Sequence, residues 1–175
     1  MTEKLAAGVA FPKITVPLIA GGEITIGGAS DTGRWTLVVV YRGRHCPLCV
    51  KYLATLQEMA EAFAEEGTDI IAVSGDGLEK AKEQVDVGSL TIPLAYDLSI
   101  PQMQSMGLYI SDPRSPEETD QPFPEPGLFV LRPEGTVQIL DISNAPFSRP
   151  DLPSILRGIT FGRDKGYPIR GTHSA

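Results

Sequence analysis

Residues 35–41 form a nearly continuous run of β-branched and aromatic side chains, and the hydrophobic period changes soon after it. Such a run is typical of a central strand that is buried on both faces. Over residues 47–66 the apolar side chains recur at steps of three and four with charged residues between them, which predicts an amphipathic helix ended by Gly67. Residues 69–73 form a second apolar run. The three segments therefore predict a β–α–β unit whose two strands run parallel.

The remaining elements are shorter. Residues 14–16 and 23–26 flank two glycines and predict an N-terminal β-hairpin, whereas residues 111–126, rich in proline and acids, predict an exposed loop. The other expected elements are a helix over 77–87, a strand over 94–96, a helix over 100–106, a hairpin of 128–132 with 136–141, and a helix over 151–161. This order predicts an α/β fold in which helices flank a central mixed β-sheet. We expect one domain over residues 1–175, with its core at 9–160 and a loose tail at 162–175.

Composition and charge limit the classes of partner. The chain has 175 residues, 42% hydrophobic and 21% charged, which is ordinary for a globular protein. Its net charge of −7 argues against nucleic acid or an anionic membrane as the main partner. No apolar run is long enough to span a membrane, and residues 1–8 lack the regions of a signal peptide. We therefore expect a cytoplasmic protein, where two neighbouring cysteines are more often catalytic or metal-binding than structural.

Those two cysteines, Cys46 and Cys49, lie where the predicted strand is followed by the predicted helix. A Cys-x-x-Cys pair beside a β–α–β pattern indicates a redox site. At a helix N-terminus the unpaired N–H groups and the helix dipole favour an anion, so the Cys46 thiol should lose its proton readily. Cys49 lies about one helical turn further on, near enough to form a disulfide with Cys46. Arg42, Arg44 and His45 are expected to place positive charge close to this pair.

The cysteine pair has two other possible interpretations. A structural zinc site normally needs four ligands, and the chain offers two cysteines and two histidines, of which His173 lies in the predicted tail. The cysteines could also be inert residues at the end of a helix. Their position directly after a buried strand favours redox chemistry over both interpretations, and no metal or other cofactor is expected.

Residues 41–49, with the sequence Tyr-Arg-Gly-Arg-His-Cys-Pro-Leu-Cys, resemble a known family of redox proteins. Together with residues 125–131 and 133–135 they are similar to the peroxiredoxin-like alkyl hydroperoxide reductase and thiol-specific antioxidant group, the redoxins, of the thioredoxin superfamily. The resemblance covers most of residues 9–160 and implies a thioredoxin-like fold. It implies that Cys46 is the attacking, peroxidatic cysteine and Cys49 the resolving one. It also implies that Pro126 faces the dithiol through a peptide bond that is usually cis; a plain loop proline is the alternative.

The sequence departs from this family at two positions that matter for activity. Typical members carry Thr or Ser three residues before the attacking cysteine, where this chain has Gly43. They also bring an arginine from a later strand, and residues 126–129 contain none. Arg42, Arg44 or Arg149 could replace it, or each could be a surface charge. Thioredoxins differ as well, because their Trp-Cys-Gly-Pro-Cys is replaced here by a motif that starts at His45.

Three functions follow as hypotheses. The first is an antioxidant thiol peroxidase that reduces hydroperoxides through a Cys46/Cys49 disulfide and is reset by a thioredoxin- or glutaredoxin-type electron donor. The second is a general thiol–disulfide oxidoreductase that acts on disulfide substrates, which Gly43 and the missing arginine favour. The third is a redox-sensing module. The resemblance also makes a homodimer an expectation.

Overall fold

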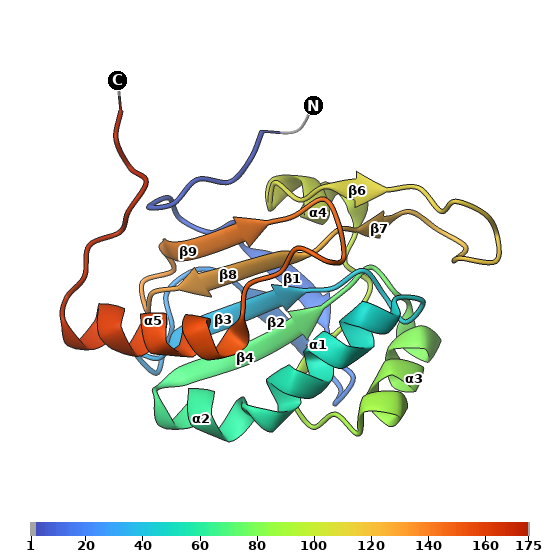
Figure 1. Ribbon diagram of the computed structural model, residues 1–175, viewed down its shortest axis with the longest axis horizontal. Helices are drawn as coiled ribbons and strands as arrows, with labels where there is room; N and C mark the ends of the chain where they lie inside the picture. Colours follow the sequence, from blue (N-terminus) through green and yellow to red (C-terminus); the bar gives the residue numbers. More distant parts are fainter. Residues whose placement is uncertain (1–2, 175) are drawn as a thin grey trace.

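The computed structural model describes residues 3–174 and is built around one mixed sheet of five strands (Figure 1). Strand β3 is central, running parallel to β4 and antiparallel to β8, so the predicted parallel β–α–β unit is confirmed. In spatial order the strands are β5 (Leu94–Ala95), β4 (Thr68–Val73), β3 (Trp35–Val40), β8 (Gly127–Leu131) and β9 (Val137–Ile142). The predicted α/β class and the hairpin of β8 and β9 are also confirmed.

Alternate residues of β3 enter two separate cores, which explains why its sequence is apolar throughout. Leu37 and Val39 pack into the core beneath the larger helical layer, whereas Val38 and Val40 pack into the core on the opposite face. The first core receives helices α1 (Pro47–Glu58), α2 (Ala60–Glu65), α3 (Leu78–Gly88) and α5 (Leu152–Asp164). The second lies under α4 (Ile100–Ser105) and the N-terminal hairpin of β1 (Ile14–Pro17) and β2 (Glu23–Ile26). Helices therefore flank the sheet on both sides (Figure 1).

The helix expected over residues 47–66 is two helices. Its backbone departs from α-helical geometry at Met59, where φ is −94° and ψ is 0°, and α2 begins at the next residue. The break directs α2 onto β4, with Phe63 fully buried. Gly67 follows with φ of +71°, a conformation that glycine adopts without strain, so the predicted end is correct.

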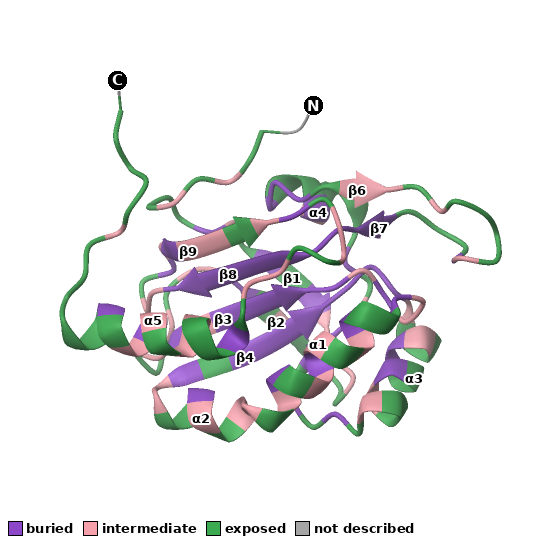
Figure 2. Cartoon of the chain, in the orientation of Figure 1, coloured by how far each residue is buried: buried purple, intermediate pink, exposed green. Residues whose placement is uncertain are grey.

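The expectation of an exposed loop at residues 111–126 is wrong in part. Strands β6 (Ile110–Ser111) and β7 (Phe123–Pro124) form an antiparallel pair, and we call residues 110–125 the β6–β7 segment. Its outer turn is exposed, whereas β7 is buried (Figure 2). The Phe123 ring is 3% exposed and Glu125 is 4% exposed. Two of its acids, Glu118 and Glu125, pair with the half-buried Arg42, whereas sequence composition alone counts them as solvated.

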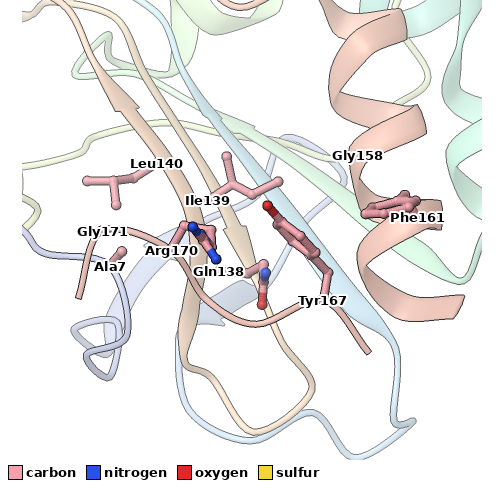
Figure 3. Close-up of a pocket in the computed structure, with 9 residues that line it drawn as sticks. All are labelled: Ala7, Gln138, Ile139, Leu140, Gly158, Phe161, Tyr167, Arg170 and Gly171. Carbon is pink, nitrogen blue, oxygen red and sulfur yellow. The ribbon is translucent and has the colours of Figure 1, made fainter. Parts of the chain in front are cut away.

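The C-terminal tail begins later than expected and contacts the rest of the chain. Helix α5 continues to Asp164, and beyond it the tail passes beside β9, where Arg132 donates a hydrogen bond to the Tyr167 carbonyl at 3.3 Å. Aromatic side chains Phe161 and Tyr167 pack together, and with the tail they enclose a hollow of about 520 Å³ (Figure 3). No helix in residues 3–174 combines the length and apolar character needed to cross a bilayer.

Candidate active site

Cys46 is the N-cap residue of α1. Its backbone is extended, with φ of −103° and ψ of 105°, and its Sγ accepts the Cys49 backbone N–H at 3.3 Å. Pro47 occupies the first turn, where its missing N–H would have had no partner. The positive end of the helix dipole therefore points at the Cys46 sulfur. The structure thus places both cysteines at the strand-to-helix junction where the sequence predicted them.

The two thiols differ in their tendency to ionise, although both are buried and neither is in a disulfide. Hydrogen bonds from the Cys49 thiol, the Cys49 backbone N–H and the Arg42 side chain, together with the charge of Arg149, outweigh burial and lower the pKa of Cys46 to about 6. Burial raises the pKa of the Cys49 thiol well above its ordinary value, and its hydrogen bond with Cys46 raises it further, so the opposing contact with Arg149 does not compensate. At neutral pH the pair therefore consists of a Cys46 thiolate and a neutral Cys49 thiol.

Arg149 is the cation nearest the sulfurs in the described structure. Its Nη2 lies 2.8 Å from Cys49 Sγ and 3.8 Å from Cys46 Sγ. The guanidinium is held by the Pro146 carbonyl, to which Nε donates at 3.0 Å, and by the Tyr52 ring at 5.2 Å. Of the three arginines proposed as substitutes for the missing strand arginine, Arg149 is the one that reaches both sulfurs. It lies between β9 and α5, about one hundred residues from Cys46 in sequence, so no local signal could single it out among the three candidates.

Arg42 and His45 both pack on one ring from the β6–β7 segment. The Arg42 guanidinium lies 4.7 Å from the centre of the Phe123 ring, and the His45 ring meets the same ring edge-on at 4.6 Å. Burial lowers the pKa of His45, which favours the neutral imidazole and works against the positive charge expected there beside Cys46.

The structure explains why position 43 is glycine. Its φ is +149°, and a Cβ there would lie 2.8 Å from Asp76 Oδ1 and 3.0 Å from His45 Nδ1. The buried Asp76 carboxylate accepts the Arg44 backbone N–H at 2.7 Å, so it fixes the turn before Cys46. A Thr or Ser side chain does not fit where typical family members have one. Asp76 was missed because its contact with Gly43 joins two different β-strand ends.

Pro126 lines a small cavity together with Tyr52 and Arg149, at the edge of the dithiol region. Its peptide bond with Glu125 is trans, so the cis geometry implied by the family resemblance is wrong for this chain. The backbone continues extended from β7 into β8, with the Glu125 N–H bonded to the Tyr109 carbonyl at 2.8 Å. That path needs only the conformation that X–Pro bonds ordinarily prefer.

A hollow of about 570 Å³ opens beside the dithiol. Leu48, Tyr52, Phe147 and Arg149 are among the residues that line it. Cys46 is only 2% exposed and neither cysteine lines this hollow; the link to the dithiol is Arg149, which lines the hollow and contacts both sulfurs. The hollow of Figure 3 is lined by other elements and contains no cysteine. Within residues 3–174, no three side chains of the His, Cys, Asp and Glu types gather as a metal site requires.

The model of the AhpC/TSA family matches residues 7–139. The chain belongs to the AhpC/TSA family. It is therefore an oxidoreductase of the peroxiredoxin-like type within the thioredoxin superfamily, as the sequence resemblance predicted. No match was found among curated protein sequences.

Solved structures confirm the thioredoxin-like fold. A peroxiredoxin-like protein from Aquifex aeolicus superposes with a TM-score of 0.75 at 18% identity, over 90% of this chain and 87% of that one. A cysteine-to-serine variant of peroxiredoxin 6 from Arenicola marina superposes with a TM-score of 0.74 at 15% identity, over 93% of this chain and 76% of that one. AhpC of Mycobacterium tuberculosis superposes with a TM-score of 0.72 at 17% identity, over 94% of this chain and 96% of that one.

Proposed function

We propose that this AhpC/TSA protein is a thiol peroxidase that reduces hydroperoxides through a disulfide cycle of Cys46 and Cys49. The observation that carries the proposal is the Cys46 sulfur at the helix N-cap, with the Cys49 N–H at 3.3 Å and the Arg149 guanidinium at 3.8 Å. These donors favour a thiolate, which is the form of cysteine that attacks. The buried Cys49 keeps its proton until it is needed in the second step.

The first step consumes the peroxide. The Cys46 thiolate attacks the terminal oxygen of the hydroperoxide, an S–O bond forms and the O–O bond breaks. The alkoxide or hydroxide that leaves takes up a proton and departs as alcohol or water. Cys46 is then a sulfenic acid, oxidised by two electrons, and Arg149 is placed to stabilise the negative charge that moves onto the leaving oxygen.

The second step protects the oxidised sulfur. The Cys49 sulfur attacks Cys46, an S–S bond forms, and the sulfenic oxygen leaves as water with the Cys49 proton. An external dithiol then reduces the disulfide by thiol–disulfide exchange. We propose a thioredoxin- or glutaredoxin-type donor in the cytoplasm for that role; a homodimer stays a prediction.

Stopped-flow oxidation of the reduced protein tests the function. We expect wild type to consume one equivalent of hydrogen peroxide or of an organic hydroperoxide much faster than a free thiol does. Cys46→Ser should lose this reaction, whereas Cys49→Ser should keep the first turnover and stop there. A wild-type rate no better than that of a free thiol at the same pH would contradict the peroxidase.

Gly43 favours a second candidate, a general thiol–disulfide oxidoreductase. A Ser or Thr hydroxyl at this position would be the group that orients the peroxide in typical family members, and the Asp76 contact leaves no room for it. The same dithiol would then act on protein disulfides. Reduction of insulin that is lost in Cys46→Ser, together with slow peroxide consumption, would favour this candidate over the peroxidase.

A further inference from the structure

Glu125 joins the β6–β7 segment to the loop that precedes Cys46. Its Oε2 lies 3.2 Å from Arg42 Nε, and its Oε1 accepts the Ser111 hydroxyl at 2.7 Å. The side chains of Glu125 and Arg42 are 5% and 16% exposed. The contact between Nε and Oε2 is an ion pair without hydrogen-bond geometry, whereas Oε1 is hydrogen-bonded to Ser111. A buried ion pair resists separation, because separating it leaves an uncompensated charge in the interior.

The Arg42 guanidinium is confined from a second direction. It lies over the Phe123 ring at 4.7 Å, an arrangement in which a cation is attracted to the ring face. The same ring packs against His45 at 4.6 Å. One buried phenyl ring of β7 therefore contacts both ends of the four-residue loop 42–45, whose next residue is Cys46.

Glu118 supports Arg42 more weakly. Its Oε1 lies 3.8 Å from Arg42 Nη2, and the same oxygen forms a closer ion pair with Arg114 Nε at 3.1 Å. Arg114 is 85% exposed, so this outer pair is open to water and to salt screening. Glu125 is the shorter and more buried contact, and its backbone is fixed between β7 and β8.

We propose, on the basis of the function proposed above, that Glu125 is a positioning residue for the thiol chemistry. Its carboxylate holds the Arg42 guanidinium over Phe123, and this contact orders the loop 42–45 that presents Cys46. Glu125 does not touch the sulfurs; it acts through Arg42. The β6–β7 segment, which the sequence presents as a loop, is on this account part of the active-site support.

The direction of the effect separates positioning from simple charge. Glu125 is a negative group near Cys46, so deleting its charge without any movement of Arg42 would make the Cys46 thiolate more stable. If Glu125 positions Arg42, the same deletion frees the guanidinium and makes the thiolate less stable. The two explanations predict opposite changes in Cys46 reactivity at low pH.

The test measures iodoacetamide alkylation of Cys46 against pH in the reduced full chain. Glu125→Gln and Arg42→Met should each slow alkylation at pH 6 by about fivefold, the change that a rise of about one in the Cys46 pKa produces. In the double variant Glu125→Gln should cause no further slowing, because its route through Arg42 is already lost. Faster alkylation in Glu125→Gln, or equal slowing in both backgrounds, overturns the proposal.

Two variants guard against misfolding and against general charge effects. Ser111→Ala removes only the hydroxyl that holds Glu125, so it should slow alkylation in the same direction by a smaller factor; an unchanged rate overturns the proposal even if Glu125→Gln does not fold. Glu117→Gln removes an exposed acid from the same segment and should leave the rate unchanged. Alkylation needs no peroxide, so a failed peroxidase assay does not decide this experiment.

Discussion

The charge on the Cys46 sulfur depends on groups from three separate places in the chain. The helix N-terminus donates the Cys49 N–H, the loop before α5 contributes Arg149, and the loop after β3 contributes Arg42. Cys49 has the same neighbours but is deeper, and burial keeps its pKa high. Within one helical turn the Cys46 thiol therefore ionises readily and the Cys49 thiol does not, which suits the proposed stepwise oxidation.

Arg149→Met tests the contribution of the nearest cation. Removing a positive charge 3.8 Å from Cys46 Sγ should destabilise the thiolate and slow its alkylation at pH 6 by about three- to tenfold. Arg157→Met, at an exposed position of α5, is the matched control and should behave as wild type. Equal alkylation by all three proteins would show that Arg149 is a packing residue.

The depressed pKa of Cys46 also predicts how stability changes with pH. Between about pH 6, where the folded thiol ionises, and about pH 8.5, where an unfolded thiol does, the unfolded chain binds the extra proton. The free energy of unfolding should therefore rise with pH across this window and lose that gain as pH falls through 6. Denaturant unfolding of wild type and Cys46→Ser at several pH values measures it; parallel curves would contradict a stabilised thiolate.

At the scale of elements, the turn between β3 and α1 depends on a contact from the end of β4. Gly43 and Asp76 meet so closely that neither strand end can change alone. The Asp76 carboxylate holds the Arg44 N–H, and the helix begins two residues later at Cys46 as N-cap. The geometry of the thiol pair is therefore set by the sheet as well as by the helix.

Gly43→Ala is expected to destabilise the protein by about 1–3 kcal/mol, because the added methyl group overlaps the Asp76 carboxylate in a conformation that favours glycine. Gly162→Ala in α5 meets no atom within 4 Å and should instead stabilise the helix by about 0.5–1 kcal/mol. Thermal and denaturant unfolding of both variants measure the difference. A neutral Gly43→Ala would mean that the turn can relax away from Asp76.

At the scale of the whole molecule, the local pattern predicted what local interactions determine. The period change after residue 41, the motif at Cys46 and Cys49, and the central strand all agree with the structure, because their apolar spacing matches their burial. Contacts between distant segments gave no such signal. Arg149 contacts Cys49 across 100 residues and was one of three candidate arginines, and the pairing of Glu125 with Arg42 also joins segments that are distant in sequence.

The tail and the hollow of Figure 3 should be independent of the thiols. Tyr167→Ala removes the ring that packs on Phe161 at 5.3 Å, and should cost about 0.5–1.5 kcal/mol of stability. Cys46 alkylation should be unchanged, since none of the residues lining that hollow contacts a sulfur. A slower alkylation rate in the folded variant would link the tail to the active site.

Mass spectrometry after one turnover tests whether Cys46 and Cys49 carry the proposed redox cycle. The reduced protein is treated with one equivalent of hydroperoxide, quenched with an alkylating reagent and digested. We predict a disulfide between Cys46 and Cys49 in wild type, with the loss of two hydrogen atoms, and a single added oxygen on Cys46 in Cys49→Ser. Unmodified cysteines after the peroxide is consumed, or oxidation of methionine instead, would contradict the account.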